Sequence, residues 1–408
     1  MDFYFPDSQD QIDPRFDFSR EEHSPFHVRQ RDDLYAHEAL DGVRPDGVLV
    51  SKPIVDGVGG RAGKYTVAQR HRLYRVGVSS FLRLNGRMKS LGDCGAFSYV
   101  SDDVPPLTPQ DAIDFYEGCQ FDEGISVDHV ILGYRSDAQL RLLTEDDPAW
   151  INRQAITLDN ADQFRRLAVE QRCRFTPVGA AQGWSPESYR KSVNELQRMG
   201  YRRIAIGGMV QLKTSQILEV LQAVDDVRRA DTRLHLLGVT RTESLHQFRE
   251  LGVASFDSTS PFRHAFMDDQ DNYYWYNGHY TAIRVPQVGG NASLKRKIRA
   301  GVVDQSAALT LESACMQALR ELDSGRSVDV EATLAVLAEY AALTGQQDRT
   351  ADYRRTLEEQ PWKLCSCGVC VKAGIEVAIF RGTERNKRRG FHNLAIFVDN
   401  LSCRIEGR

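Results

Sequence analysis

The amino-acid sequence predicts an α/β fold: a (β/α)8 TIM barrel with a helical insertion and a C-terminal zinc-binding subdomain. Short runs rich in valine, isoleucine and leucine recur along the chain, helical patterns separate them, and three cysteines gather near the end. Strands that alternate with helices indicate a parallel sheet. Because the alternation continues over about 220 residues, a closed barrel is favoured, and an open doubly wound sheet is the alternative.

The expected strands are short apolar runs of strand length. They cover residues 47–50, 129–132, 175–178, 203–206, 234–237 and 253–256. Between them, residues 186–199 are expected to form a helix, because Ser185 is a suitable N-cap and Gly200 a suitable stop. The apolar spacing predicts further helices over residues 214–228 and 243–251.

Four parts of the chain are expected. Residues 1–45 are polar and include Pro6, Pro14 and Pro25, so we interpret them as an irregular N-terminal extension packing on the barrel. The other parts are the main part of the catalytic barrel (46–264), a helical insertion (265–360) with helices over 307–322 and 328–343, and the zinc-binding subdomain with a C-terminal helix (361–408).

The composition is that of a globular protein with a large core, since 41% of the residues are apolar and 26% are charged. No apolar run approaches the roughly 18–20 residues of a membrane span, and the first residues do not resemble a secretory signal. We therefore expect a cytoplasmic protein that does not contact a membrane. The 52 basic and 56 acidic side chains give a net charge of −4, so any nucleic-acid surface must be a local basic patch.

Polar residues stand beside several of the expected strands, and (β/α)8 barrels place their chemistry at strand ends. Asp93, Asp128 and Asp257 are carboxylates, Gln182 is an amide, and Gly207–Gly208 offers bare backbone amides. Paired carboxylates are typical of substitution at a sugar anomeric carbon, where one attacks and the other moves protons. The amide groups suit the edge of a purine. Ordinary turn chemistry is the alternative for each residue alone, so the prediction depends on their repetition across strands.

A second pattern indicates a metal. Cys365, Cys367 and Cys370 stand within six residues, and His392 is the only histidine after them. Three thiolates and one imidazole complete a tetrahedral site without an open position, so we expect a structural Zn2+. The alternative is a set of reduced thiols beside a surface histidine.

In this order, the motifs resemble the tRNA-guanine transglycosylase family, whose members are (β/α)8 barrels with a C-terminal Cys-x-Cys-x-x-Cys…His zinc subdomain. The resemblance covers residues 45–265 and 360–400. Besides the zinc ligands, it depends on Asp93-Cys-Gly-Ala-Phe97, Ala181-Gln-Gly183, Gly207-Gly-Met209 and Phe256-Asp-Ser-Thr-Ser-Pro-Phe-Arg263.

Within that family, the chain looks closest to the DNA-modifying branch, the DNA 7-deazaguanine transglycosylases, which residues 5–10, 28–37 and 126–134 resemble. It departs from the tRNA enzymes at Ala96, where they have glycine, and at His264-Ala-Phe-Met267, where they carry an arginine that helps to hold the anticodon loop. The resemblance implies exchange of guanine in DNA for 7-cyano-7-deazaguanine (preQ0). It also implies partner proteins from a DNA-modification cluster and a homodimer.

The resemblance also implies a role for each site residue. Asp257 is expected to attack C1′ of a deoxyguanosine, and Asp93 to move protons to and from the bases. Asp128, Gln182 and the backbone of Gly207, Gly208 and Met209 are expected to bind the base edge.

Contacts with DNA phosphates are expected from local basic residues. The candidates are Arg263, near the expected nucleophile, Lys295 and Arg296, and Arg388 and Arg389 beside the zinc motif. A solvated charged face is the alternative for the last two pairs.

Two other functions stay open. One is a tRNA-guanine transglycosylase that takes part in queuosine-type tRNA modification, which base exchange into tRNA but not DNA would indicate. The other is a non-catalytic nucleic-acid-binding subunit, against which the presence of both Asp93 and Asp257 argues.

Overall fold

The computed structural model describes residues 1–136 and 147–405. Eight parallel strands form a closed barrel in sequence order, and β1 pairs with β8 to close it. The predicted (β/α)8 fold is therefore confirmed. The strands are β1 (Asp2–Pro6), β2 (Gly47–Ser51), β3 (Lys89–Asp93), β4 (Glu123–Ile125), β5 (Thr176–Ala181), β6 (Arg203–Ile206), β7 (Arg233–Leu236) and β8 (Val253–Asp257).

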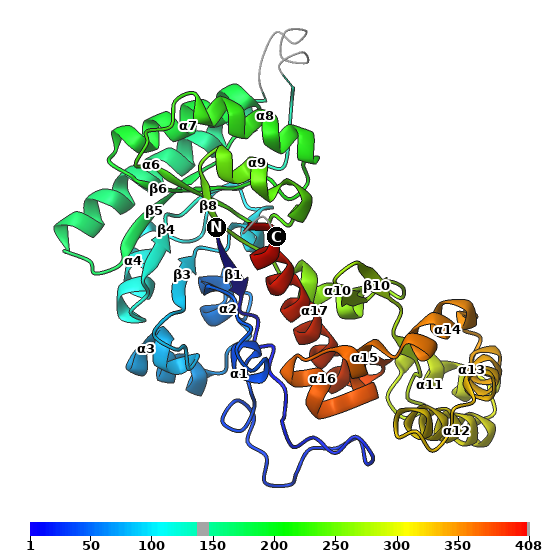
Figure 1. Cartoon of the computed structure of the whole chain (residues 1–408). Helices are drawn as coiled ribbons and strands as arrows, with labels where there is room; N and C mark the ends of the chain where they lie inside the picture. Colours follow the sequence, from blue (N-terminus) through cyan, green and yellow to red (C-terminus); the bar gives the residue numbers. More distant parts are fainter. Residues whose placement is uncertain (137–146, 406–408) are drawn as a thin grey trace. The chain divides into compact units, whose positions relative to one another are not determined.

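Helices cover the outside of the barrel, as Figure 1 shows for α6, α7 and α8. The predicted N-cap of α7 is correct, because the Ser185 side chain accepts a hydrogen bond from Ser188 N. Buried side chains from β1 to β6 fill the inside. The helices of the barrel are α2 (Lys52–Asp56), α3 (Val67–Phe81), α4 (Pro109–Gly118), α6 (Pro148–Glu170), α7 (Pro186–Arg198), α8 (Thr214–Asp225) and α9 (Leu245–Glu250), with 3-10 helices η1 (Ala96–Tyr99) and η2 (Thr242–Ser244).

Strands β3 and β4 escape prediction from the sequence because glycines occupy places where apolar side chains would mark a strand. A Cβ on Gly92 would lie 2.3 Å from the ring of Tyr116, and a Cβ on Gly124 would lie 2.4 Å from it. The Tyr116 ring, which α4 supplies, therefore fills the space of two strand side chains. Glycine in a strand often marks such a close approach.

The predicted strand over residues 129–132 is wrong. Val130 and Ile131 are buried, as strand residues would be. However, side chains accept hydrogen bonds from this run: His129 N donates to Thr157 Oγ1 at 3.0 Å, and Ile131 N donates to Gln182 Oε1 at 3.3 Å. The run is an irregular connection that follows β4 and contacts Gln182.

The chain divides into two compact units. The first contains residues 1–9, 45–259 and, at the end of the described chain, 404–405, and the second contains residues 10–44 and 260–403. Residues 2–6 form β1 of the barrel, so the expectation that all of residues 1–45 are irregular is wrong there. Their other regular element is the short helix α1 (Ala36–Ala39). The boundaries of the four expected parts stay a prediction.

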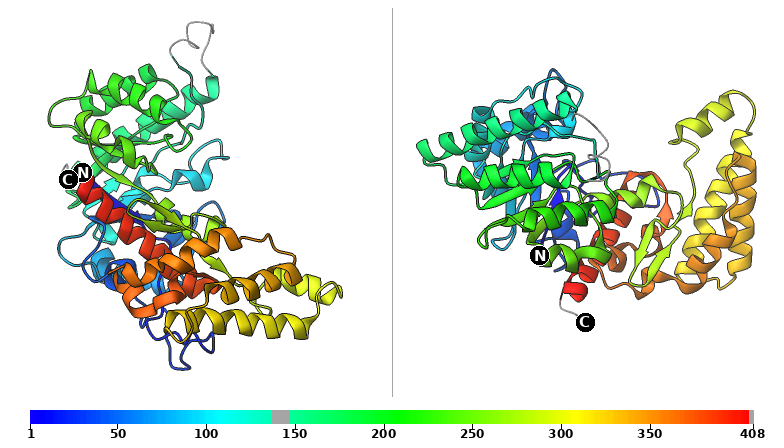
Figure 2. Two further views of the ribbon diagram at one scale, coloured as in Figure 1. Left: turned by 45° about the vertical axis from the view of Figure 1, so that its right-hand side comes forward. Right: turned by 90° about the horizontal axis from the view of Figure 1, so that it is seen from above.

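The second unit is mainly helical, and Figure 2 shows its long helices α12 and α13 side by side. These two are the helices predicted over residues 307–322 and 328–343. No helix in the described part of the chain is long and apolar enough to cross a membrane. The elements are α10 (Ser260–Met267), the hairpin β9 (Tyr273–Trp275) and β10 (Gly278–Tyr280), β11 (Ile283–Arg284) paired with β12 (Ile379–Phe380), α11 (Ala292–Arg299), α12 (Gln305–Asp323), α13 (Val330–Thr344), α14 (Thr350–Glu359), α15 (Pro361–Leu364), α16 (Gly368–Ala373), η3 (Gly374–Val377) and α17 (Gly382–Ile405).

Candidate active site and metal centre

The predicted site residues of the barrel stand at the carboxyl ends of its strands. Asp93 is the last residue of β3, and Asp257 is the last residue of β8. Asp128, Gln182 and Gly207 come after β4, β5 and β6. The carboxyl ends of the strands in a parallel barrel meet at one face, so the fold brings all five residues to the same end.

Asp93 combines burial with nearby negative charge. Its Oδ2 accepts a hydrogen bond from Ser51 Oγ at 2.6 Å. Burial is the main cause that raises the pKa of Asp93 to about 6, and the charges of Asp128 and Asp257 act in the same direction, whereas the bond from Ser51 lowers it. Asp257 is thus close enough for its charge to act on Asp93. A carboxyl group with this pKa can give and take a proton near neutral pH.

Asp257 is fixed through one of its two oxygens. Its Oδ1 accepts a hydrogen bond from Gly238 N at 2.9 Å and lies 3.2 Å from His235 Nε2. His235 Nδ1 lies 2.9 Å from Ser255 Oγ, and a hydroxyl that donates to Nδ1 leaves the ring proton on Nε2, facing Asp257. Both bonds go to Oδ1, so Oδ2 stays available to an electrophile.

Asp128 lies in a buried network of side chains. Cys94 Sγ donates to Asp128 Oδ1 at 2.9 Å, and Gln182 Nε2 donates to Oδ2. Tyr99 OH lies 3.2 Å from Cys94 Sγ and donates to Asp128 O at 3.1 Å. Burial raises the pKa of Asp128 above its ordinary value. The network fixes a carboxylate and an amide side by side, which is the combination expected for binding a purine edge.

Gly207 and Gly208 lie against the same network. A Cβ on Gly207 would lie 2.1 Å from Gln182 Nε2, and Gly208, at φ +74°, would place its Cβ 2.8 Å from Ile131 O. Both positions therefore require glycine. Tyr189 OH donates to Gly207 O at 2.8 Å and holds the turn. The side chain of Met209 is fully buried, so only its backbone could meet a polar ligand.

Sequence reasoning missed three polar residues of this site. His235 stands inside an apolar run, and Ser51 is the last residue of β2. Cys94 lies within a motif already recognised, directly after Asp93. The sequence feature that could have identified them is a polar side chain within or directly beside a run of apolar strand residues.

Three cysteines and one histidine converge near the C-terminus, and all are buried: Cys365, Cys367, Cys370 and His392. The three Sγ atoms lie 3.4, 3.6 and 3.3 Å from His392 Nδ1. A tetrahedral zinc ion with bonds of ~2.3 Å to sulfur and ~2.0 Å to nitrogen would separate them by about 3.5 Å. His392 Nε2 donates to Tyr274 O at 2.8 Å, which leaves Nδ1 for a metal. The residues fit zinc, and the alternative of a surface histidine is wrong.

The basic residues predicted to contact phosphates divide into two groups. Arg263, Lys295 and Arg296 are exposed. Arg388 and Arg389 are buried, and this corrects their expected role. Arg388 pairs with a glutamate of its own helix at 2.6 Å, and Arg389 donates to the backbone carbonyls of three residues. Their guanidinium groups thus hold the second unit together and do not reach a nucleic acid.

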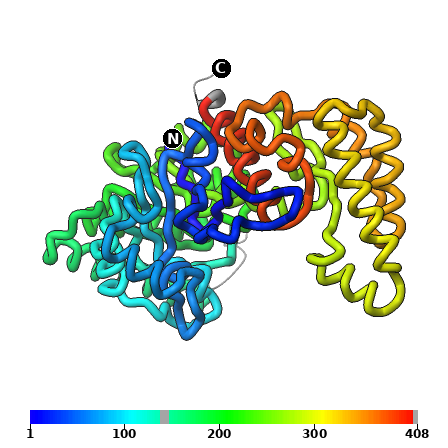
Figure 3. Tube along the Cα trace, turned by 90° about the horizontal axis from the view of Figure 1, so that it is seen from below, coloured from blue at the N-terminus to red at the C-terminus, as the bar shows by residue number. Residues whose placement is uncertain are grey.

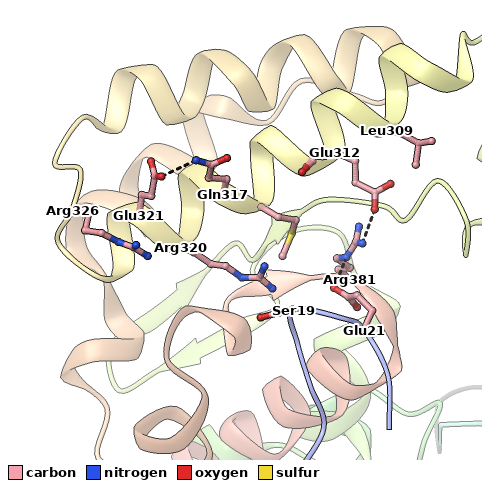
Figure 4. Close-up of a pocket in the computed structure, with 11 residues that line it drawn as sticks. Ser19, Glu21, Leu309, Glu312, Gln317, Arg320, Glu321, Arg326 and Arg381 are labelled. Carbon is pink, nitrogen blue, oxygen red and sulfur yellow. Dashed lines mark hydrogen bonds and ion pairs between the residues drawn. The ribbon is translucent and has the colours of Figure 1, made fainter. Parts of the chain in front are cut away.

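A separate polar cavity of about 500 Å³ lies in the second unit, between α12 and residues of the N-terminal loop (Figure 4). Arg381 on its wall pairs with Glu21 and Glu312, so its charge is already neutralised. Arg320 likewise pairs with Glu376. None of the predicted catalytic residues lines this cavity, and we assign it no part in the reaction.

Comparison with known proteins identifies the family to which the chain belongs. A family model described as queuine tRNA-ribosyltransferase matches residues 76–282. A protein of Salmonella montevideo named DNA-guanine transglycosylase is 47% identical over 416 residues, which cover all of this chain and 98% of that protein.

The fold and these matches together define a glycosyl-transferring enzyme. The chain belongs to the queuine tRNA-ribosyltransferase family. The resemblance inferred from the motifs is thereby confirmed, and so is its DNA-modifying branch, which the name of the Salmonella relative describes.

Proposed function

We propose that this enzyme exchanges guanine in DNA for a 7-deazaguanine base through a covalent intermediate on Asp257. The observation that carries the proposal is the carboxylate pair at the strand ends. Among the described residues, both groups bonded to the Asp257 carboxylate meet its Oδ1, and Asp93, whose pKa is raised to about 6, lies within range of its charge. Similarity over the whole chain to a protein named DNA-guanine transglycosylase supports DNA and guanine as its substrates.

In the first step, Asp257 Oδ2 attacks C1′ of a deoxyguanosine. The bond between C1′ and N9 of guanine breaks, and its electron pair leaves with the base. Asp93, protonated at this stage, donates its proton to the departing guanine. The products are free guanine and a deoxyribosyl ester of Asp257.

In the second step, a 7-deazaguanine takes the place of guanine. Asp93 removes the proton from its N9, and this nitrogen attacks C1′. The ester bond breaks, and its electron pair returns to Asp257 as a carboxylate. Two displacements at C1′ retain its configuration.

The base would be held by the network around Asp128. The Asp128 carboxylate accepts hydrogen bonds, the Gln182 amide can accept and donate them, and the backbone at Gly207–Gly208 approaches without a side chain in the way. In duplex DNA the nucleotide must first leave the stack, which costs a few kcal/mol. The choice of 7-cyano-7-deazaguanine, the partner proteins and a homodimer follow from the family resemblance alone. A zinc ion held by the Cys3His cluster would supply structural stability.

The test is nucleoside analysis after incubation with labelled 7-cyano-7-deazaguanine and either DNA or tRNA, with and without the proteins of the same gene cluster. We expect label in a deoxynucleoside. Asp257→Asn should reduce incorporation by about a thousandfold or more, whereas His246→Ala, which changes an exposed histidine on α9, should not. Label in tRNA and not in DNA would overturn the proposal and favour the activity after which the family model is named. Undiminished exchange by Asp257→Asn would overturn the mechanism.

A further inference from the structure

The second unit begins with a long loop that has little regular structure of its own. Residues 10–35 contain no helix or strand, only isolated bridges between Ile12 and Leu34 and between Asp17 and Glu22. Figure 3 shows this segment as a dark-blue loop. Loops of this length without regular structure are uncommon in compact proteins, so other interactions must order it.

Two histidines and two aspartates converge inside the loop: Asp13, His23, His27 and Asp33. His23 Nδ1 lies 2.8 Å from Asp13 Oδ2, and His27 Nε2 lies 3.9 Å from the same oxygen. His27 Nε2 also lies 2.7 Å from Asp33 Oδ1. The ligand atoms of Asp13, His23 and His27 are all within 4.8 Å of one another.

These separations and residue types suit a metal ion. Donor atoms around a tetrahedral ion with bonds of ~2.0–2.1 Å lie about 3.3 Å apart. The two separations between Asp13 Oδ2 and the histidine nitrogens, 2.8 and 3.9 Å, bracket that value. Imidazole donors favour divalent transition metals, whereas Ca2+ and Mg2+ prefer oxygen donors alone.

The two carboxylates of the cluster also accept backbone hydrogen bonds, as metal-ligating carboxylates usually do. Asp13 Oδ1 accepts a hydrogen bond from Arg15 N at 2.8 Å, and Asp33 Oδ2 accepts one from Gln30 N at 2.6 Å. Each carboxylate thus has one oxygen tied to the backbone and the other turned toward a histidine. Such outer contacts fix the orientation of metal ligands. The rings of His23 and His27 are stacked, with centroids 4.7 Å apart, so the two side chains lie against each other.

We propose that Asp13, His23 and His27, with Asp33 beside His27, bind a divalent transition-metal ion such as Zn2+. This second site shares no residue with the Cys3His cluster. The ion would join separated points of the loop and hold them near α17, to which Asp13 is already attached: its N–H donates to Glu384, and its carbonyl accepts from Arg388.

The alternative explanation of these contacts is that the histidines and carboxylates are hydrogen-bonded to one another and bind no metal. The metal content of the protein distinguishes the two explanations. The full chain is stripped with a chelator, reloaded with Zn2+, dialysed against a weak chelator and measured by mass spectrometry of the metal. We expect two zinc ions per chain, and one in a His23→Ala/His27→Ala variant. His246→Ala, which changes an exposed histidine beside Glu250, should keep two.

A second measurement identifies the donors. Co2+ added to protein that already holds one equivalent of Zn2+ should give weak visible absorption without thiolate charge-transfer bands, because the remaining site contains no sulfur. His23→Ala alone changes a side chain that is 46% exposed, so folding should survive, and the affinity for the second ion should fall about tenfold or more. A single zinc ion in the unchanged protein, or unchanged affinity in His23→Ala, would overturn the proposal.

Discussion

His235 directs its Nε2 to Oδ1 of Asp257 at 3.2 Å, and Ser255 holds the opposite ring nitrogen at 2.9 Å. Neighbouring strands β7 and β8 supply these groups, so the barrel itself sets their geometry. Together with Gly238 N–H, the imidazole fixes one oxygen of the proposed nucleophile. It is a positioning residue, because it acts on the reaction through Asp257.

His235→Ala should lower kcat for guanine release by roughly 10- to 100-fold with little change in KM, because one of two donors to Oδ1 is lost. His235→Gln, which can keep an N–H near Oδ1, should recover part of the rate. Single-turnover release of guanine from DNA measures the step. An equal loss in both variants would argue for a packing role only.

The pH dependence of guanine release should follow the protonation of Asp93. Its protonated form is needed to expel guanine, so this step should decline as pH rises through about 6. The hydrogen bond from Ser51 lowers the pKa of Asp93, so Ser51→Ala should raise it and keep the proton on to higher pH. We expect the alkaline limb of kcat/KM to move upward by about one pH unit. A limb that stays in place or moves down would contradict the assignment.

Removal of the Cys3His ligands should weaken the second unit. Cys367→Ser should lower the zinc content by one ion per chain and destabilise this unit by several kcal/mol, since metal binding contributes directly to folding. Thermal unfolding followed by near-ultraviolet circular dichroism measures the effect. Cys173→Ser, on a cysteine outside the cluster, is the matched control and should change neither quantity.

The exposed pair on α11 should contribute to DNA affinity through charge alone. Lys295→Ala/Arg296→Ala should weaken binding and reduce the slope of log K against log salt by about 2, the value for two phosphate contacts. Lys191→Ala, on an exposed lysine of α7, is the control. An unchanged slope in the double variant would mean that this patch is only a solvated face.

We expect Arg389, unlike Lys295 and Arg296, to contribute to stability and not to DNA affinity. Its guanidinium is fully buried and donates to backbone carbonyls, among them Ala265 O and Ile379 O. Arg389→Met should therefore destabilise the second unit by roughly 3–5 kcal/mol, because the carbonyls lose their partner. DNA affinity per folded molecule should not change. Denaturant unfolding and a salt titration of binding give the two readouts.

The sequence was most informative where elements carry their own local signals. Strands β5 to β8 have apolar runs, and α7 has its cap at Ser185. Strands β3 and β4 were invisible because Tyr116 of another element replaces their side chains. Asp257 could be found because it ends an apolar run, and Asp93 because it begins the motif Asp93-Cys-Gly-Ala-Phe97, whereas His235 was hidden by its apolar neighbours.

The sequence also could not predict which charged and polar groups pair across long distances along the chain. The basic cluster of α17 looked like a nucleic-acid surface, but several of its partners stand more than 350 positions earlier. Arg385 pairs with Glu21 at 2.8 Å, and Arg388 Nη2 donates to Asp13 O. The sequence of an arginine-rich segment is the same whether water or a loop from elsewhere in the chain contacts its guanidinium groups.

The two donors on Oδ1 of Asp257 have a consequence for the ester that the proposed reaction would form. Once Oδ2 is bonded to the sugar, Oδ1 becomes the ester carbonyl, and the N–H groups of Gly238 and His235 still face it. They stabilise negative charge there, which makes the carboxylate a better leaving group when the incoming base attacks. The contacts that steady the attacking group would thus also ease its release, so that the same aspartate could start another cycle of exchange.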